Sequence, residues 1–163
     1  MLARVPSWVF GVFALLLALG ILLSRPRTVH PIAPSLVAAG FVFYSLYGVV
    51  SSFGASPASI LPWAAGLLAS VFLGKPYFGP SGMTRISGTS KVLVPGSWLP
   101  LGLMMGIFLT KFLVGFVQGA RLPVGTQVWF APAVCCVLGS LSGGFTSRAL
   151  NVRRYVQETA SDP

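Results

Sequence analysis

Lys111 is a basic residue deep inside an apolar run, and its ammonium group could hold an anion or an acidic partner. An ionisable side chain at such a position predicts a functional site, because a charge is costly to place in lipid. The two acidic residues of the sequence, Glu158 and Asp162, both lie in the C-terminal tail. Lys111 would therefore need hydroxyls, backbone carbonyls, a lipid phosphate, a bound anion or another subunit. The alternative is that its long side chain simply extends to the membrane interface.

Three other polar residues could join Lys111 in an intramembrane polar site. Gln118 lies in the same apolar run, on the same face of a helix. Tyr44 and Tyr47 lie in an earlier apolar run and could turn their hydroxyl groups inward. The alternative for the two tyrosines is an ordinary place at the interface or in helix packing. The candidate site is thus Lys111, Gln118, Tyr44 and Tyr47.

The residue types in the apolar runs do not favour catalysis. The runs contain serines and threonines, but no Asp, Glu or His that could activate them as nucleophiles. Cys135 and Cys136 are adjacent and would point about 100° apart on a helix, which suits packing better than a disulfide or a metal site. His30 stands alone in a polar link. We expect no enzymatic activity, no catalytic residue, no cofactor and no metal.

The overall composition of the chain indicates that the candidate polar residues lie on transmembrane helices. The chain has 163 residues, of which 55% are hydrophobic and 8% charged, and its mean hydropathy is +0.84. Soluble domains carry about 25% charged residues, so lipid must cover much of this surface. The sequence predicts one all-α transmembrane domain, 1–163, with about five spans at 7–24, 35–53, 58–73, 98–117 and 128–150. Two alternatives are a signal peptide for the first run and a re-entrant pair for the second and third.

The polar segment between the third and fourth runs has the pattern of a short β-hairpin. Residues 83–86 and 91–94 flank the sequence Ser87-Gly88-Thr89-Ser90. A glycine-containing turn between two short strand-like segments is typical of a hairpin. We therefore predict a hairpin-like loop at this point, on the cytoplasmic side.

The basic residues are distributed unevenly between the two sides that five spans define. One side receives Arg4 and Arg121, and the other receives Arg25, Arg27, Lys75, Arg85, Lys91, Arg148, Arg153 and Arg154. Lys and Arg are retained in the cytoplasm, which places the N-terminus outside and the C-terminus inside. The net charge of +9 comes from scattered bases without a basic stripe. This favours contacts with anionic lipid at the inner face, and not with nucleic acid.

Small residues recur every fourth position in the last apolar run. The predicted helix-packing ridge consists of Gly139, Ser140, Gly143, Gly144 and Ser147. Small residues at this spacing let two helix backbones approach closely, which drives association in lipid. The ridge could serve packing within one subunit or in a homo-oligomer, and the alternative is that it lines a permeation path.

The segment PGSWLPLGLMMGIFLTKFLVG at 95–115 resembles the signature of a family of small bacterial inner-membrane proteins with a domain of unknown function. Arg25-Pro-Arg27, Tyr47-Gly48 and the sequence Ser-Gly-Gly-Phe at 142–145 fit the same family. The resemblance covers most of the chain. It implies a bacterial membrane protein with four or five spans, and it implies no activity.

Two functions from different classes remain open. The leading hypothesis is a non-enzymatic interaction or assembly protein, in which a membrane partner complements Lys111. The alternative is a component of a transporter or channel for a small anionic or polar solute. Five helices are few for a complete carrier, so this second function would require an oligomer.

Overall fold

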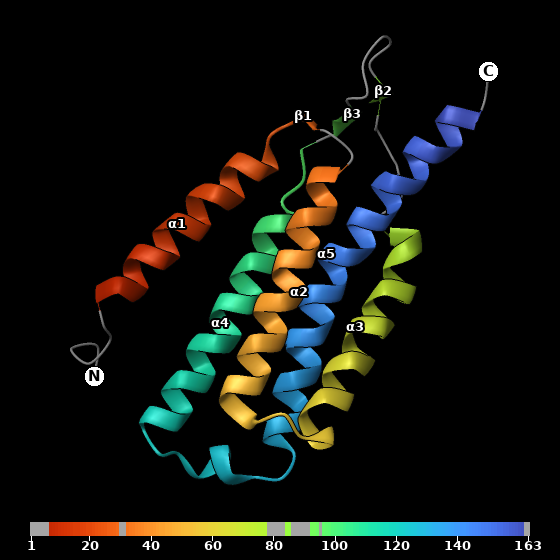
Figure 1. Cartoon of the computed structure of the whole chain (residues 1–163). Coiled ribbons are helices and arrows are strands. Elements are labelled where there is room, and N and C mark those ends of the chain that lie inside the picture. Colours follow the sequence, from red (N-terminus) through yellow and green to blue (C-terminus); the bar gives the residue numbers. More distant parts are fainter. Residues whose placement is uncertain (1–6, 30–31, 78–83, 86–91, 95, 162–163) are drawn as a thin grey trace.

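The computed structural model describes residues 7–29, 32–77, 84–85, 92–94 and 96–161. In this part of the chain the elements follow in the order α1, β1, α2, α3, β2, β3, α4, η2 and α5 (Figure 1). Helices α1, α3 and α5 run in one direction, and α2 and α4 run in the other. His30 and the predicted turn at 87–90 lie outside the described residues.

The five α-helices have the following bounds: α1 Ser7–Ser24, α2 Ile32–Phe53, α3 Pro57–Tyr77, α4 Leu99–Gly119 and α5 Phe130–Ser161. The short 3-10 helix η2 is Pro123–Thr126. The apolar run predicted for the last helix stops at 150, whereas α5 continues to Ser161. Residues 151–161 contain neither proline nor glycine, so nothing in them breaks a helix. The hydropathy of the sequence indicates where the apolar part of α5 ends, and the helix itself continues beyond that point.

Helix α5 is the centre of the bundle. It packs against α2, α3 and α4, while α2 also packs against α3, and α1 packs against α4. The contact of α1 with α4 includes Phe13 and Phe108, whose ring centroids are 5.6 Å apart. In Figure 1, α1 lies at the outside of the bundle and leans away from α2.

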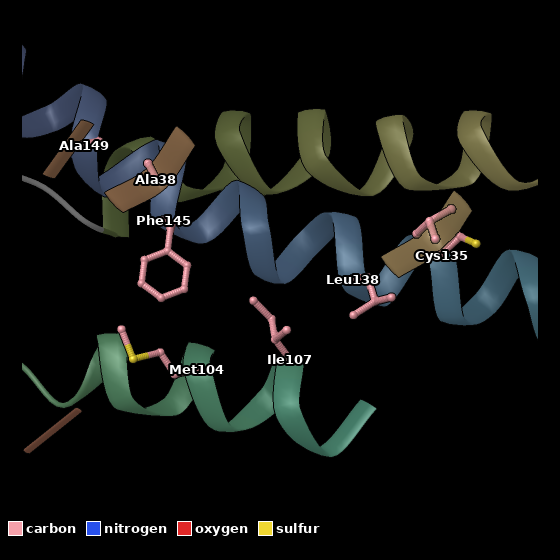
Figure 2. Close-up of a cluster of buried hydrophobic side chains, with 8 residues drawn as sticks. Ala38, Met104, Ile107, Cys135, Leu138, Phe145 and Ala149 are labelled. Atoms are coloured by element: carbon pink, nitrogen blue, oxygen red, sulfur yellow. The ribbon is translucent and has the colours of Figure 1, made fainter. Parts of the chain in front are cut away.

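A cluster of buried hydrophobic side chains joins α2, α4 and α5. Met104 and Ile107 of α4 point toward Phe145 and Leu138 of α5 (Figure 2). The Phe145 ring also stacks on Phe41 of α2, at 4.3 Å between centroids and an interplanar angle of 4°. Because side chains in lipid gain little from leaving it, this close packing itself stabilises the bundle.

Helices α3 and α5 lie closest together, and glycine makes their approach possible. A Cβ atom added at Gly143 would come within 2.5 Å of the Leu67 carbonyl oxygen and 2.8 Å of the Ser70 Cβ. A Cβ at Gly139 would collide with the Trp63 carbonyl, and one at Gly66 would collide with the Cys136 carbonyl. Glycine therefore occurs on both helices of this pair, and any side chain would push their backbones apart.

Three short strands tie two of the links together at one end of the bundle. They are β1 Arg27–Val29, β2 Thr84–Arg85 and β3 Val92–Val94, in the sheet order β1-β3-β2. Both pairs are antiparallel, with Thr28 and Thr84 on either side of Leu93. The link from α1 to α2 is thereby joined to the link from α3 to α4, at the end of the bundle toward which α5 runs (Figure 1).

Four of the helices are long and apolar enough to cross a membrane, among the residues described: Ile32–Phe53, Pro57–Gly74, Leu99–Gly119 and Phe130–Gln157. The stretch Phe10–Ser24 of α1 is apolar as well, but shorter. Many large hydrophobic side chains of these helices point outward, as expected for surfaces that face lipid. The architecture is that of a helical membrane protein.

Candidate functional site

Lys111 lies on α4 and extends its side chain across to α2. Its Nζ lies 3.7 Å from the centroid of the Tyr44 ring, a distance typical of a cation–π contact. The same Nζ donates to the backbone carbonyl of Tyr44 at 3.4 Å, which is long for a hydrogen bond. The structure thus brings together two of the four candidate polar residues.

Gly48 makes the space that the ammonium group occupies. A Cβ atom at this position would lie 2.6 Å from the Lys111 Cε and would collide with Nζ. Helical carbonyls bond the N–H four residues on, so the Tyr44 carbonyl points toward Gly48. Because Gly48 has no side chain, Lys111 can reach this carbonyl from the side.

Gln118 makes a second contact between the same two helices. Its Nε2 donates to the Ser52 carbonyl at 3.5 Å. Helices α2 and α4 run in the same direction (Figure 1), so the two contacts follow one another along both helices. Both side chains reach backbone carbonyls of α2, although α4 itself packs against α1 and α5.

Tyr47 does not join this group of contacts. It is 72% exposed on α2, whereas Tyr44 is 51% exposed and carries the cation–π contact. The sequence predicted that both tyrosines lie near one face of the helix. Two residues that are three positions apart, such as Tyr44 and Tyr47, nevertheless point about 60° apart around the helix axis. That difference is enough to turn Tyr47 away from the ammonium group and outward.

The depth of Lys111 follows from helix geometry. Helix α4 ends at Gly119, so the Cα of Lys111 lies about 12 Å from that end at 1.5 Å per residue. Gly48, which the ammonium contacts, lies about 8 Å from the end of α2 at Phe53 by the same rise. The side chain therefore crosses from α4 to α2 within the candidate membrane spans Leu99–Gly119 and Ile32–Phe53.

A buried polar network joins α2, α3 and α5, and sequence reasoning missed it. The indole Nε1 of Trp63 donates to the Ser45 hydroxyl at 3.1 Å, and Ser45 donates to the Leu138 carbonyl at 3.2 Å. Ser142 donates to the same carbonyl at 2.9 Å. In the sequence, Trp63 lies near the start of the predicted run at 58–73, a position typical of interfacial tryptophans. The pairing of Trp63 with Ser45 depends on which helices become neighbours, and no local pattern shows this.

The ridge predicted on α5 faces two different helices. Gly139 and Gly143 lie against α3, whereas a Cβ at Gly144 would lie 3.0 Å from a Leu103 side-chain carbon of α4. Ser140 lies near Gly66 of α3. Ser147 is 1% exposed, and among the described residues its hydroxyl has no hydrogen-bond partner. Gly139, Ser140, Gly143 and Gly144 thus lie against neighbouring helices of the same chain.

The two cysteines differ in their surroundings. Cys135 is fully buried in the core cluster, whereas Cys136 is exposed, and neither forms a disulfide. The split agrees with the 100° between neighbouring residues on a helix. Cys135 contributes to packing, and the structure places neither thiol beside Lys111.

The fold and the lysine held between α2 and α4 define a helical membrane protein with a polar contact at membrane depth. The chain belongs to the Family of unknown function (DUF6622), whose model matches residues 1–162. This confirms the resemblance to a family of unknown function that the 95–115 segment carries. No curated protein and no solved structure matches the chain.

Proposed function

We propose that this chain is a non-enzymatic, multi-pass membrane protein that assembles with another membrane protein through Lys111. The observation that supports the proposal is the position of the Lys111 ammonium, which lies over the Tyr44 ring and against Gly48 at membrane depth. A charged lysine at the centre of a spanning helix costs about 3 kcal/mol on insertion scales. A protein that retains such a group at this depth has a use for its charge.

The contacts within the chain compensate this charge only in part. A cation–π contact contributes about 0.5–2 kcal/mol, and the carbonyl contact at 3.4 Å is long. An ammonium has three N–H donors, and the described residues supply it with one acceptor and one aromatic face. A carboxylate on a partner helix would complete its coordination.

The partner must reach Lys111 from the lipid side, and the surface there is open. Gly115, one turn along α4 on the same face as Lys111, is exposed, and Tyr44 is 51% exposed. A second copy of the chain cannot supply the carboxylate at this depth, because the acidic residues of the sequence are Glu158 and Asp162, beyond the apolar part of α5. The partner is therefore a different protein with an acidic residue in a spanning helix.

The orientation belongs to the same proposal. We place the chain in a bacterial inner membrane with five spans, its N-terminus outside and its C-terminus in the cytoplasm. The family resemblance supports the compartment, and the eight basic residues on one side of the five spans support the orientation. A reporter fused after residue 163 should be active in the cytoplasm, and one inserted in the link at 120–129 should be active outside. The reverse pattern would contradict the orientation.

The assembly function is tested by comparing Lys111→Met, Lys111→Arg and Arg121→Gln. Arg121 lies in the link after α4, and its substitution removes one positive charge outside the spanning helices. We expect Lys111→Met to lose a co-purifying membrane protein in mild detergent, Lys111→Arg to retain part of it, and Arg121→Gln to retain all of it. Retention of every partner by Lys111→Met would contradict the proposal.

Solute flux in reconstituted vesicles separates the assembly function from the transporter alternative. We expect wild type and Lys111→Met vesicles to have the same permeability to small anions. If Lys111→Met abolished an anion flux and left the co-purified proteins unchanged, the chain would be a transport component and the assembly proposal would be wrong.

A further inference from the structure

We infer that the end of the bundle next to the sheet binds the phosphate groups of anionic phospholipids through Arg25, Arg153 and Arg154. These three arginines are exposed, and they belong to α5 and to the link after α1, far along the chain from one another. This inference is independent of the proposed role of Lys111, which lies nearer the other end of the bundle.

The length of α5 sets Arg153 and Arg154 at the level of the lipid headgroups. Helix α5 begins at Phe130, directly after the exposed Trp129, and tryptophans mark the membrane interface. About 20 residues of helix cross a hydrocarbon core of roughly 30 Å, so the core ends near Leu150. Arg153 and Arg154 follow about 5 Å further on, at 1.5 Å per residue. The headgroup layer extends roughly 5–7 Å beyond the core on each side.

Arg25 reaches the same layer from another helix. It directly follows Ser24, the last residue of α1, and α1 and α5 run in the same direction (Figure 1). The backbone here is held in place, because a Cβ at Gly96 would lie 3.1 Å from the Pro26 nitrogen and 3.2 Å from the Arg25 carbonyl carbon. Gly96, in the link before α4, thus lies against the backbone at the end of α1.

The sheet brings further basic positions to this end of the molecule. Arg27 is in β1 and Arg85 is in β2, on either side of β3. The sheet joins the two links that carry them, so the backbone positions of these two residues are held at a fixed spacing. Toward the opposite end, the described residues contain two basic residues, Arg121 and Lys111. Most of the basic residues that the structure describes are therefore at the end next to the sheet.

The chemistry of the guanidinium group matches that of a lipid phosphate. Arginine presents a planar set of donors that can bond two oxygens of one phosphate. Each basic side chain near an anionic membrane surface contributes about 1 kcal/mol of attraction, which corresponds to about fivefold in affinity. Two adjacent exposed arginines on one helix turn are sufficient for a measurable preference for anionic lipid.

Native mass spectrometry of the full chain in detergent tests the inference, with phosphatidylglycerol and phosphatidylcholine as probes. Basic residues also set the orientation of a chain in a bilayer. A chain in detergent has no such orientation, so lipid binding measured there reports the contact between the arginines and the lipid. We expect wild type and Arg121→Gln to prefer phosphatidylglycerol. The double variant Arg153→Gln/Arg154→Gln should bind it about 30-fold more weakly, and Arg25→Gln about fivefold more weakly. Equal binding of phosphatidylglycerol by the double variant and Arg121→Gln would overturn the inference.

A charge-retaining variant and a salt titration make the test decisive. Arg153→Lys/Arg154→Lys retains the charge and should retain the preference, although with weaker binding than wild type. If the glutamine variant did not fold, the salt dependence of binding by wild type would decide, because binding to arginines must weaken as salt rises. Binding that did not depend on salt would overturn the inference, and so would complete displacement of the lipid by millimolar inorganic phosphate.

Discussion

The side chain of Lys111 occupies the space that a side chain at Gly48 would need. A Cβ at position 48 would lie 2.6 Å from the Lys111 Cε, and the ammonium group lies beside the Tyr44 carbonyl that this gap exposes. Glycine in a helix costs about 1 kcal/mol relative to alanine in water. Its presence at position 48 is explained by the lysine that lies against it.

The Gly48→Ala variant should fold normally and displace the ammonium group. The atoms that a new methyl group meets belong to the flexible end of Lys111, so the helices need not move. We expect the thermal midpoint to change by no more than about 2 °C, which corresponds to about 0.5–1 kcal/mol for a chain of this size. Association with the partner should weaken, measured by quantitative co-purification. Gly40→Ala is the control, because a Cβ at Gly40 meets no atom within 4 Å, and it should leave both properties unchanged.

The Gly143→Ala variant should destabilise the bundle. Its new methyl group would lie 2.5 Å from a backbone oxygen of α3 at Leu67, and a backbone cannot give way as a side chain can. Overpacking of this kind costs about 1–3 kcal/mol, which unfolding in detergent followed by circular dichroism would measure. Gly102→Ala on α4 is the control, because its Cβ meets no atom within 4 Å. If the Gly143→Ala and Gly102→Ala variants were equally stable, α3 and α5 would not approach each other as closely as the structure shows.

Ser45→Ala should weaken the junction of α2, α3 and α5. The substitution leaves the Trp63 indole N–H without its acceptor and removes one donor to the Leu138 carbonyl. Hydrogen bonds between membrane helices contribute about 0.6 kcal/mol on average and up to about 1.7 kcal/mol, and we expect a loss toward the upper value. Ser51→Ala removes a hydroxyl that bonds within its own helix, to Gly48, and should cost less. A double-mutant cycle of Ser45→Ala with Trp63→Phe that gave no coupling would refute the network.

Lys111→Met should not reduce the stability of the isolated chain. The ammonium costs about 3 kcal/mol at membrane depth, and the contact with the Tyr44 ring returns about 0.5–2 kcal/mol. Methionine fills similar volume without this cost. We expect the free energy of unfolding in bicelles to stay equal or to rise by about 1 kcal/mol. A loss of 2 kcal/mol or more would mean that Lys111 is retained for the fold and not for a partner.

The sequence predicted where the helices lie along the chain better than it predicted which elements pack against one another. Apolar runs indicated every helix, because lipid imposes a minimum length and an apolar composition on each span. The pairing of β1 with β3 was missed, since Thr28 and Leu93 are far apart in the sequence and three-residue strands carry little signal. The end of α5 was missed for a different reason, because residues beyond 150 are polar and yet helical.

The same distinction holds for the candidate site. Lys111 could be singled out by its charge, and Tyr44 by its hydroxyl, yet Tyr44 uses its ring and its backbone carbonyl. The sequence predicted no role for Gly48 in the site, because its role is to leave room for a side chain of another helix. Residue type indicates which groups can interact, and the helix arrangement decides which of them meet.

Photo-crosslinking from the surface beside Lys111 tests the central proposal most directly. A photoreactive residue would replace Tyr47, which is exposed on α2 and directly precedes Gly48, and in a control would replace Leu68, which is exposed on α3. We expect a crosslink in intact membranes from position 47 to one membrane protein with an acidic residue in a spanning helix. This crosslink should disappear in the Lys111→Met background and be absent from position 68. A crosslink of equal strength with and without the Lys111 charge would show that no partner binds through Lys111.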